Sequence, residues 1–162
     1  MKKLKWMAFV PMLAIMCLIW SFSAHSGEES SGQSLGIISR IIQVIEHVTD
    51  QEWTEEQEIT FQEMIHTPIR KAAHMTEYLI LELLTAVPFL LYKKRRSWIV
   101  KVSFIICFLY ACSDEIHQLF VPERSGQFTD VLVDCTGVAI GCVLFCLIYG
   151  AIHSSEISSQ PH

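Results

Sequence analysis

The stretch IRKAAHMTEYLILELLTAVPFLLYKKRR, residues 69–96, decides the fold. Its apolar run, Ile69 to Tyr92, is long enough to cross a hydrocarbon core of about 30 Å at a rise of about 1.5 Å per residue. Four consecutive basic residues, 93–96, follow the run, and such clusters mark the cytoplasmic end of a membrane span. We therefore predict a transmembrane helix that ends in the cytoplasm.

Three further apolar runs lie at about residues 6–22, 98–120 and 131–152. The first run also has features of a signal peptide, because MKKLK precedes it and Ser21 and Ser23 have the spacing of a cleavage site. It exceeds the usual signal-peptide core of about 7–15 residues, which favours a retained span. The chain is therefore predicted to be an all-α membrane protein, a four-transmembrane-helix bundle over residues 1–153 with a polar tail at 154–162.

The composition and the distribution of charge agree with a multi-pass membrane protein. The sequence is 51% apolar and 18% charged, below the roughly 25% charged residues of a soluble domain. With the N-terminus inside, eight Lys or Arg lie on the cytoplasmic side and four outside, which predicts an N-in/C-in topology. Neither basic cluster has interleaved aromatic residues, so no nucleic-acid partner is expected. The six cysteines lie in or beside apolar runs and are predicted to be packing residues.

The segment between the first two spans, residues 23–67, is predicted to be extracytoplasmic and amphipathic. Apolar residues recur at helical spacing over residues 34–49, and nine of the seventeen acids lie between residues 28 and 63. A second helix is predicted to begin at Thr54, with Gln57 completing a capping box, and to run to Ile65. Thr67-Pro68 then predicts the start of the second span. The apolar face would lie on the outer leaflet or cover the bundle; a loose acidic loop is the alternative.

Ionisable residues lie inside the predicted spans, where each charge costs roughly 2.5–3.5 kcal/mol on insertion scales. At about 100° per residue, Arg70, His74 and Glu77 share one stripe of the second span. Similar stripes occur at the end of the third span and the start of the fourth, and all three are expected in the same outer slab of the membrane. The third span contributes Asp114, Glu115, His117 and Gln118, and the fourth contributes Asp130 and Asp134.

Gly137 and Gly141 form a small-xxx-small pattern on the fourth span. Such a pattern lets another helix approach closely, which would bring Asp134 against the stripe of the second or third span. The same face could also join two copies of the chain, so an oligomer through Gly137 and Gly141 is a further expectation.

The residues alone leave three interpretations of this polar cluster open. The first is a structural network of buried ion pairs that fixes helix register. The second is recognition of a phosphate or carboxylate by Arg70, beside histidines and carboxylates that orient polar groups. The third is catalysis with His74 or His117 as general base, or a metal held by both histidines and a carboxylate. No metal or cofactor is predicted.

Three segments contain most of these polar residues: IRKAAHMTEY at 69–78, YACSDEIHQLFVPERSG at 110–126, and Asp130 followed by DCTG at 134–137. Together they closely resemble the motifs of the VanZ-like family. The resemblance covers about residues 6–150, and its second motif is highly specific. The chain departs from the family pattern at Glu123, where the family usually has glycine, which makes that turn uncertain and adds a charge beside Arg124.

The resemblance implies an integral membrane protein of the bacterial cell envelope, from a family named for resistance to the glycopeptide teicoplanin. We expect membrane lipids as partners, with a lipid-linked envelope precursor or a glycopeptide as ligand. One hypothesis is binding without turnover; a second is an intramembrane enzyme that modifies a lipid or wall intermediate, using His117 with Asp114 or Glu115; a third is a small transporter. The ligand-binding candidates are Arg70, Lys71, Gln118, Arg124, Asp130 and Asp134; the catalytic candidates, if the protein is an enzyme, are His74, Glu77, Asp114, Glu115 and His117.

Overall fold

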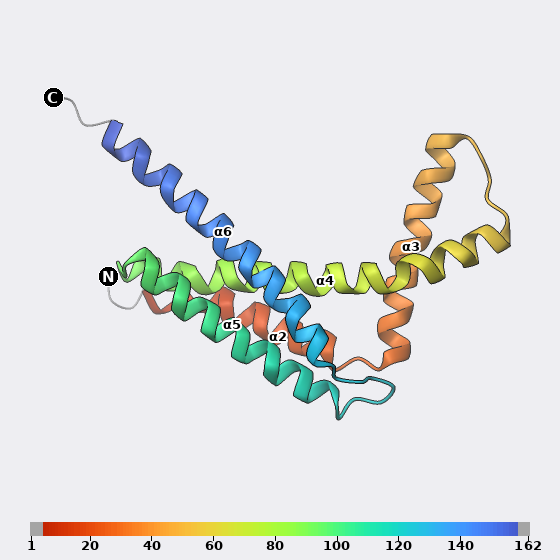
Figure 1. Ribbon diagram of the computed structural model, residues 1–162, viewed down its shortest axis with the longest axis horizontal. Helices are drawn as coiled ribbons and strands as arrows, with labels where there is room; N and C mark the ends of the chain where they lie inside the picture. Colours follow the sequence, from red (N-terminus) through yellow and green to blue (C-terminus); the bar gives the residue numbers. More distant parts are fainter. Residues whose placement is uncertain (1–4, 159–162) are drawn as a thin grey trace.

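The computed structural model describes residues 5–158 and the side chains as far as Ile152. The described residues form helices and no strand, as predicted. The helices are α2 (Phe9–Ser23), α3 (Gly27–Thr49), α4 (Glu55–Leu91), α5 (Arg96–Gln118) and α6 (Phe128–Ser158) (Figure 1). Helix α6 thus extends into the segment that was predicted to be a polar tail. Residues 159–162 lie outside the described part, and so do Lys2 and Lys3, which were counted in predicting the N-in/C-in topology.

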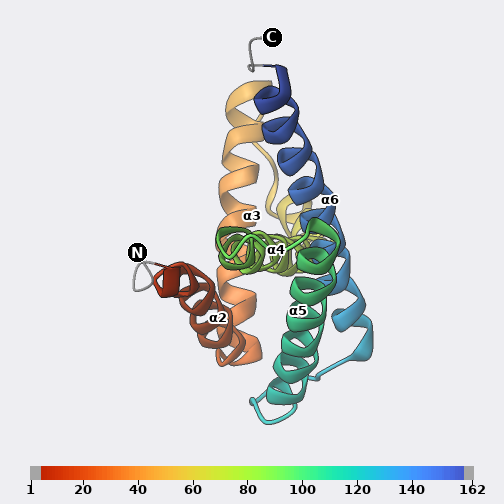
Figure 2. The same ribbon diagram turned by 90° about the vertical axis from the view of Figure 1, so that its left-hand side faces the viewer.

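Helix α4 is the centre of the molecule and packs against α2, α3, α5 and α6. Figure 2 shows α4 almost end-on, with α2 to one side of it and α5 and α6 to the other. Helices α2, α4, α5 and α6 alternate in direction, so both ends of the chain lie at the same end of the bundle (Figure 1). The α2–α3 corner and the α5–α6 loop lie at the opposite end.

The predicted break before the second span is wrong, because α4 continues from Glu55 to Leu91 with Pro68 inside it. Its start is as predicted: the Thr54 side chain accepts from the Gln57 backbone N–H, and the Thr54 N–H donates to Gln57 Oε1. A proline inside a helix removes one N–H donor and crowds the carbonyl four residues earlier, and α4, which packs against four other helices, accommodates both at Pro68. The helix therefore passes through Ile65 and Thr67 without a turn.

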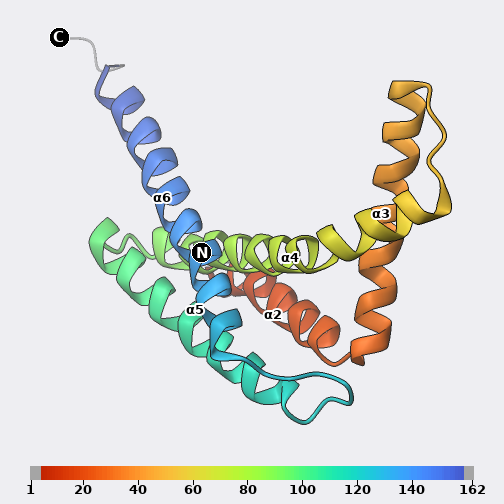
Figure 3. The same ribbon diagram turned by 45° about the vertical axis from the view of Figure 1, so that its right-hand side comes forward.

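Helix α3 is longer than predicted and stands across the bundle. It begins at Gly27 rather than residue 34, because Ser26 and Glu29 form a second capping box. Helices α2 and α3 are bent by 106° at the break between them, and Figure 3 shows α3 crossing α4. Ile38 and Ile42 are buried, so part of the apolar face covers the bundle.

Two helices of the described residues are long and apolar enough to cross a membrane: α4 and residues Phe128–Ile152 of α6. The bent pair α2 and α3 would add a third if it is counted as one span. A membrane helical protein is therefore supported. The predicted four spans and the predicted extracytoplasmic segment go beyond the two or three candidate spans found here.

The main core cluster joins α2, α4, α5 and α6 around buried Tyr78 and Leu81. A Cβ atom on Gly137 would overlap the backbone of Met75, and one on Gly141 would lie 2.9 Å from Cβ of Glu82. The close approach predicted from these glycines therefore occurs within the chain, between α6 and α4. Association of two chains stays a prediction. All six cysteines are free.

Candidate functional site

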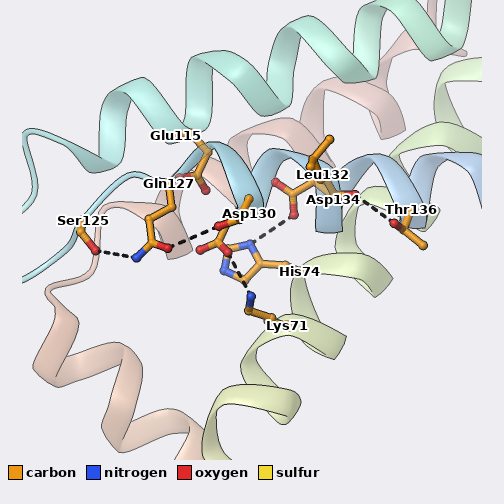
Figure 4. A network of polar contacts seen from close by, with 10 residues as sticks. Lys71, His74, Glu115, Ser125, Gln127, Asp130, Leu132, Asp134 and Thr136 are labelled. Atoms are coloured by element: carbon orange, nitrogen blue, oxygen red, sulfur yellow. Dashed lines mark hydrogen bonds and ion pairs between the residues drawn. The ribbon is translucent and has the colours of Figure 1, made fainter.

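The predicted polar residues gather where α2 and α5 end, α3 and α6 begin, and α4 passes by (Figure 4). A cavity of about 280 Å³ opens there between α2, α3, α4 and the α5–α6 loop. Its apolar wall includes Ile19, Phe22, Ile37 and Ile69. Its polar wall contains Ser23, Ser34, Arg70, His74, Glu77, Asp114 and Arg124.

Two arginines line both this cavity and a second one of about 60 Å³ beside it. Arg70 comes from α4, and Arg124 comes from the loop between α5 and α6. The Arg124 Nη2 donates to the Phe22 carbonyl at 3.3 Å, which holds the guanidinium at the end of α2. Burial, and then the nearby Arg70 charge, lower the pKa of Arg124. Arginine remains protonated in proteins, so the two guanidiniums form a cationic wall.

His74 lines both cavities and faces Asp134 on α6 (Figure 4). The His74 Nδ1 lies 3.7 Å from Asp134 Oδ1, within ion-pair distance but beyond a hydrogen bond. Asp134 is fully buried, and neither of its carboxylate oxygens has a hydrogen-bond partner among the described residues. The glycines of α6 make this approach possible, because Gly137 lies one turn after Asp134.

Lys71 and Asp130 form an ion pair at the edge of the site, with 3.5 Å between Nζ and Oδ1. Their side chains are 39% and 22% exposed, so solvent screens the pair. Asp130 lines the smaller cavity, whereas Lys71 lines neither. Lys71 is thus a neighbour of the site rather than part of its wall.

Asp114 and Glu77 are the carboxylates of the larger cavity. Asp114 is fully buried, and the Gln118 side chain donates to its Oδ2 at 3.2 Å. Its Oδ1 has no hydrogen-bond partner among the described residues. Gln118 itself lines the smaller cavity.

Glu115 and His117 were predicted as catalytic residues, but neither lines either of these two cavities. Glu115 Oε2 accepts the Gln127 backbone N–H at 2.8 Å and so fastens the α5–α6 loop. The His117 ring stacks on Trp20, with 4.0 Å between ring centroids. Residues 114, 115 and 117 point in three directions around α5, and only Asp114 faces the cavity.

The α5–α6 loop also holds the start of α3, a role that the sequence did not predict. Gly27 N–H donates to the Pro122 carbonyl at 3.2 Å, and Glu28 N–H donates to the Glu123 carboxylate at 3.2 Å. Glu123 has a φ of 59°, in the left-handed region that favours glycine. The VanZ-like family usually has glycine at this position, and that preference indicated a turn of this kind in the sequence.

A second buried polar cluster surrounds Glu82, deeper in the bundle. Glu82 is fully buried, and its carboxylate accepts from the Ser103 hydroxyl and from the thiols of Cys107 at 3.3 Å and Cys142 at 3.1 Å. These donors come from α5 and α6, so the cluster joins three helices. No sequence pattern predicted these partners of Glu82. The serines of the cavity, Ser23 at the end of α2 and Ser34 inside α3, were also missed, because an isolated serine carries no specific signal.

The described residues contain no group of three His, Cys, Asp or Glu arranged to hold a metal ion. Comparison with curated proteins and with solved structures finds no match. Comparison with family models matches VanZ/LLP1 over residues 8–149, nearly the whole chain. The chain that carries this arginine-lined cavity is thus a member of the VanZ/LLP1 family.

Proposed function

We propose that the protein binds an anionic group of a cell-envelope ligand in the larger cavity. The observation that carries this proposal is the pair Arg70 and Arg124, which reach one cavity from α4 and from the α5–α6 loop. Guanidinium groups grip phosphate or carboxylate in a bidentate way, with bonds stronger than those between neutral groups. Asp114 and Glu77 on the same wall suit hydroxyl or amino groups of that ligand.

The proposed topology is four spans in a bacterial cell membrane, with both termini in the cytoplasm. The alternating directions of α2, α4, α5 and α6 support it, and so does the basic cluster between α4 and α5 at the end where the termini lie. Helix α3 and the acidic beginning of α4 would then lie outside. The cavity would open near the outer surface of the membrane.

The proposed ligands are a lipid-linked envelope precursor or a glycopeptide, and the proposed role is reduced sensitivity to teicoplanin. The family resemblance supports the role, and the cationic wall supports the ligand class. A bacterial strain that expresses the protein should need more teicoplanin for growth inhibition than one that lacks it. Arg70→Ala and Arg124→Ala should abolish that difference, whereas Lys101→Ala, an exposed residue of α5 outside both cavities, should keep it. Unchanged resistance in both arginine variants would refute the proposal.

A second candidate function is acid–base catalysis on the bound ligand, favoured by the His74–Asp134 pair. A carboxylate beside one ring nitrogen orients the imidazole and stabilises its protonated form, the arrangement of a general base. His74 lines the cavity and His117 does not, so His74 replaces His117 in this hypothesis. A change in envelope lipids that depends on the protein and disappears in His74→Ala would favour catalysis. An unchanged lipid profile, with ligand binding intact in His74→Ala, would favour binding alone.

A further inference from the structure

A shallow groove on the surface of α3 adjoins the arginine-lined cavity. The groove measures about 360 Å³ and is lined by Ile37, Arg40, Ile41, Val44 and Ile45. Ile37 lines the groove and the cavity as well, so the two spaces meet at this side chain. The cavity therefore offers charged side chains, Arg70 among them, and the adjoining groove offers apolar side chains of α3.

The apolar row of the groove is exposed at Ile37 and Val44 and partly buried at Ile41. Ile37, Ile41 and Val44 lie on one face of α3 at helical spacing, and Ile37 and Val44 are 49% and 62% exposed. Ile38 and Ile42, on the neighbouring face, are buried. The row thus remains available after α3 has packed on the bundle. Arg40 stands beside it with an exposed side chain.

The direction of α3 fits a helix that lies in the membrane surface. Helix α3 is turned by 106° from α2 and crosses α4 (Figure 3). If α4 crosses the membrane, α3 runs along the membrane surface. The row begins at Ile37, which also lines the cavity between α2 and α4. Interfacial helices place such a row at the boundary of head groups and acyl chains, with basic side chains at the phosphates.

We propose that the ligand is a membrane lipid with an anionic head group, which enters sideways from the outer leaflet. The head group lies between Arg70 and Arg124, and an acyl chain follows Ile37, Ile41 and Val44. This inference rests on the proposed anion site and adds the class of ligand. The position of the groove directly beside the cavity, with Ile37 lining both, carries it, because a water-soluble anion would use only the polar side chains.

The test uses the full chain in phosphatidylcholine nanodiscs that contain dansyl-labelled phosphatidic acid. Energy transfer from the tryptophans to dansyl reports the lipid, and calorimetry with glycerol 3-phosphate reports the head-group site alone. Val44→Asn and Ile41→Asn should each weaken lipid binding about fivefold, the effect of losing one or two buried methyl groups, and leave glycerol 3-phosphate binding unchanged. Arg70→Ala should weaken both at least tenfold. Ile59→Asn, at a position on α4 that is 49% exposed and lies outside the groove, is the control.

The outcomes separate the two proposals. If Arg70→Ala weakens both ligands and the α3 variants weaken neither, the anion site stands and the lipid inference is overturned. Glycerol 3-phosphate binding as tight as that of phosphatidic acid would overturn it in the same way. If Arg70→Ala weakens neither ligand, the proposed function itself fails. A dimer of the wild-type chain that Val44→Asn dissociates, without loss of lipid, would assign the groove to a second copy.

Discussion

Replacing Asp134 with asparagine tests whether the buried acid serves function or structure. The carboxylate is fully buried, and among the described residues it has no hydrogen-bond partner and one ion-pair partner, His74 at 3.7 Å. A charge inside a membrane helix costs roughly 2.5–3.5 kcal/mol, and an amide of the same shape costs less. Asp134→Asn should therefore raise the free energy of unfolding by about 1–2 kcal/mol, which corresponds to a rise in Tm of about 2–8 °C. It should also reduce the protein's effect on teicoplanin sensitivity.

The chain's own cysteines provide the assay for this variant. Cys107 is fully buried and all six thiols are free, so a thiol-reactive fluorophore reports thermal unfolding in detergent. Asp130→Asn is the matched control one turn earlier on α6, and its half-exposed pair with Lys71 should change stability by less than about 1 kcal/mol. A lower Tm for Asp134→Asn, with teicoplanin sensitivity unchanged, would show that the His74 pair is structural and would refute the reasoning.

Substitutions of Gly137, Glu82 and Glu123 test the packing that builds the site. Gly137→Ala places a methyl group against the Met75 backbone. It should lower stability by about 1–3 kcal/mol in the same thermal assay. Gly36→Ala on α3, with open space around it, should raise stability by about 0.5–1 kcal/mol. Glu82→Ala removes the acceptor of three buried donors and should cost about 2 kcal/mol or more; an unchanged Tm would mean that these bonds contribute nothing. Glu123→Gly relaxes a positive φ but loses the contact with the α3 N-terminus, so it should change stability by less than about 1 kcal/mol. Glu123→Val loses the same contact and keeps the positive φ, so it should have the lower Tm of the two in far-ultraviolet circular dichroism melts.

Much of the fold could be predicted because it depends on local patterns. The apolar runs gave the helices of the bundle, and the capping box at Thr54 gave the beginning of α4. The glycine pair on α6 predicted the close helix approach that brings Asp134 to His74. These signals work from sequence because each depends on residues within one or two helical turns.

The failures concern contacts between distant segments. Pro68 reads locally as a helix start, yet α3 packs against α4 and the helix continues through it. The spacing of Asp114 and His117 suggested one site, but their directions around α5 send His117 to Trp20 instead. The loop contacts of Glu123 with α3 join residues 95 positions apart, which no local pattern reveals. The predicted site residues that share the larger cavity come from α4, from α5 and from the α5–α6 loop.

The two walls of the cavity are held by different kinds of contact. On the side of His74, α6 meets α4 without room for a Cβ at Gly137, so a shift of either helix would open a gap in a close-packed seam. On the opposite side, α3 is attached to the α5–α6 loop by single hydrogen bonds at Gly27 and Glu28, and the bond to Glu123 is exposed. Such bonds contribute about 0.5–1.5 kcal/mol each, and the packing of buried Ile38 and Ile42 holds the middle of α3 on the bundle. Arg70 lies on α4, whose seam with α6 is close-packed, whereas Arg124 lies on the loop that these bonds attach to α3. The two arginines of the proposed anion site thus belong to parts of the fold that are held by different kinds of contact.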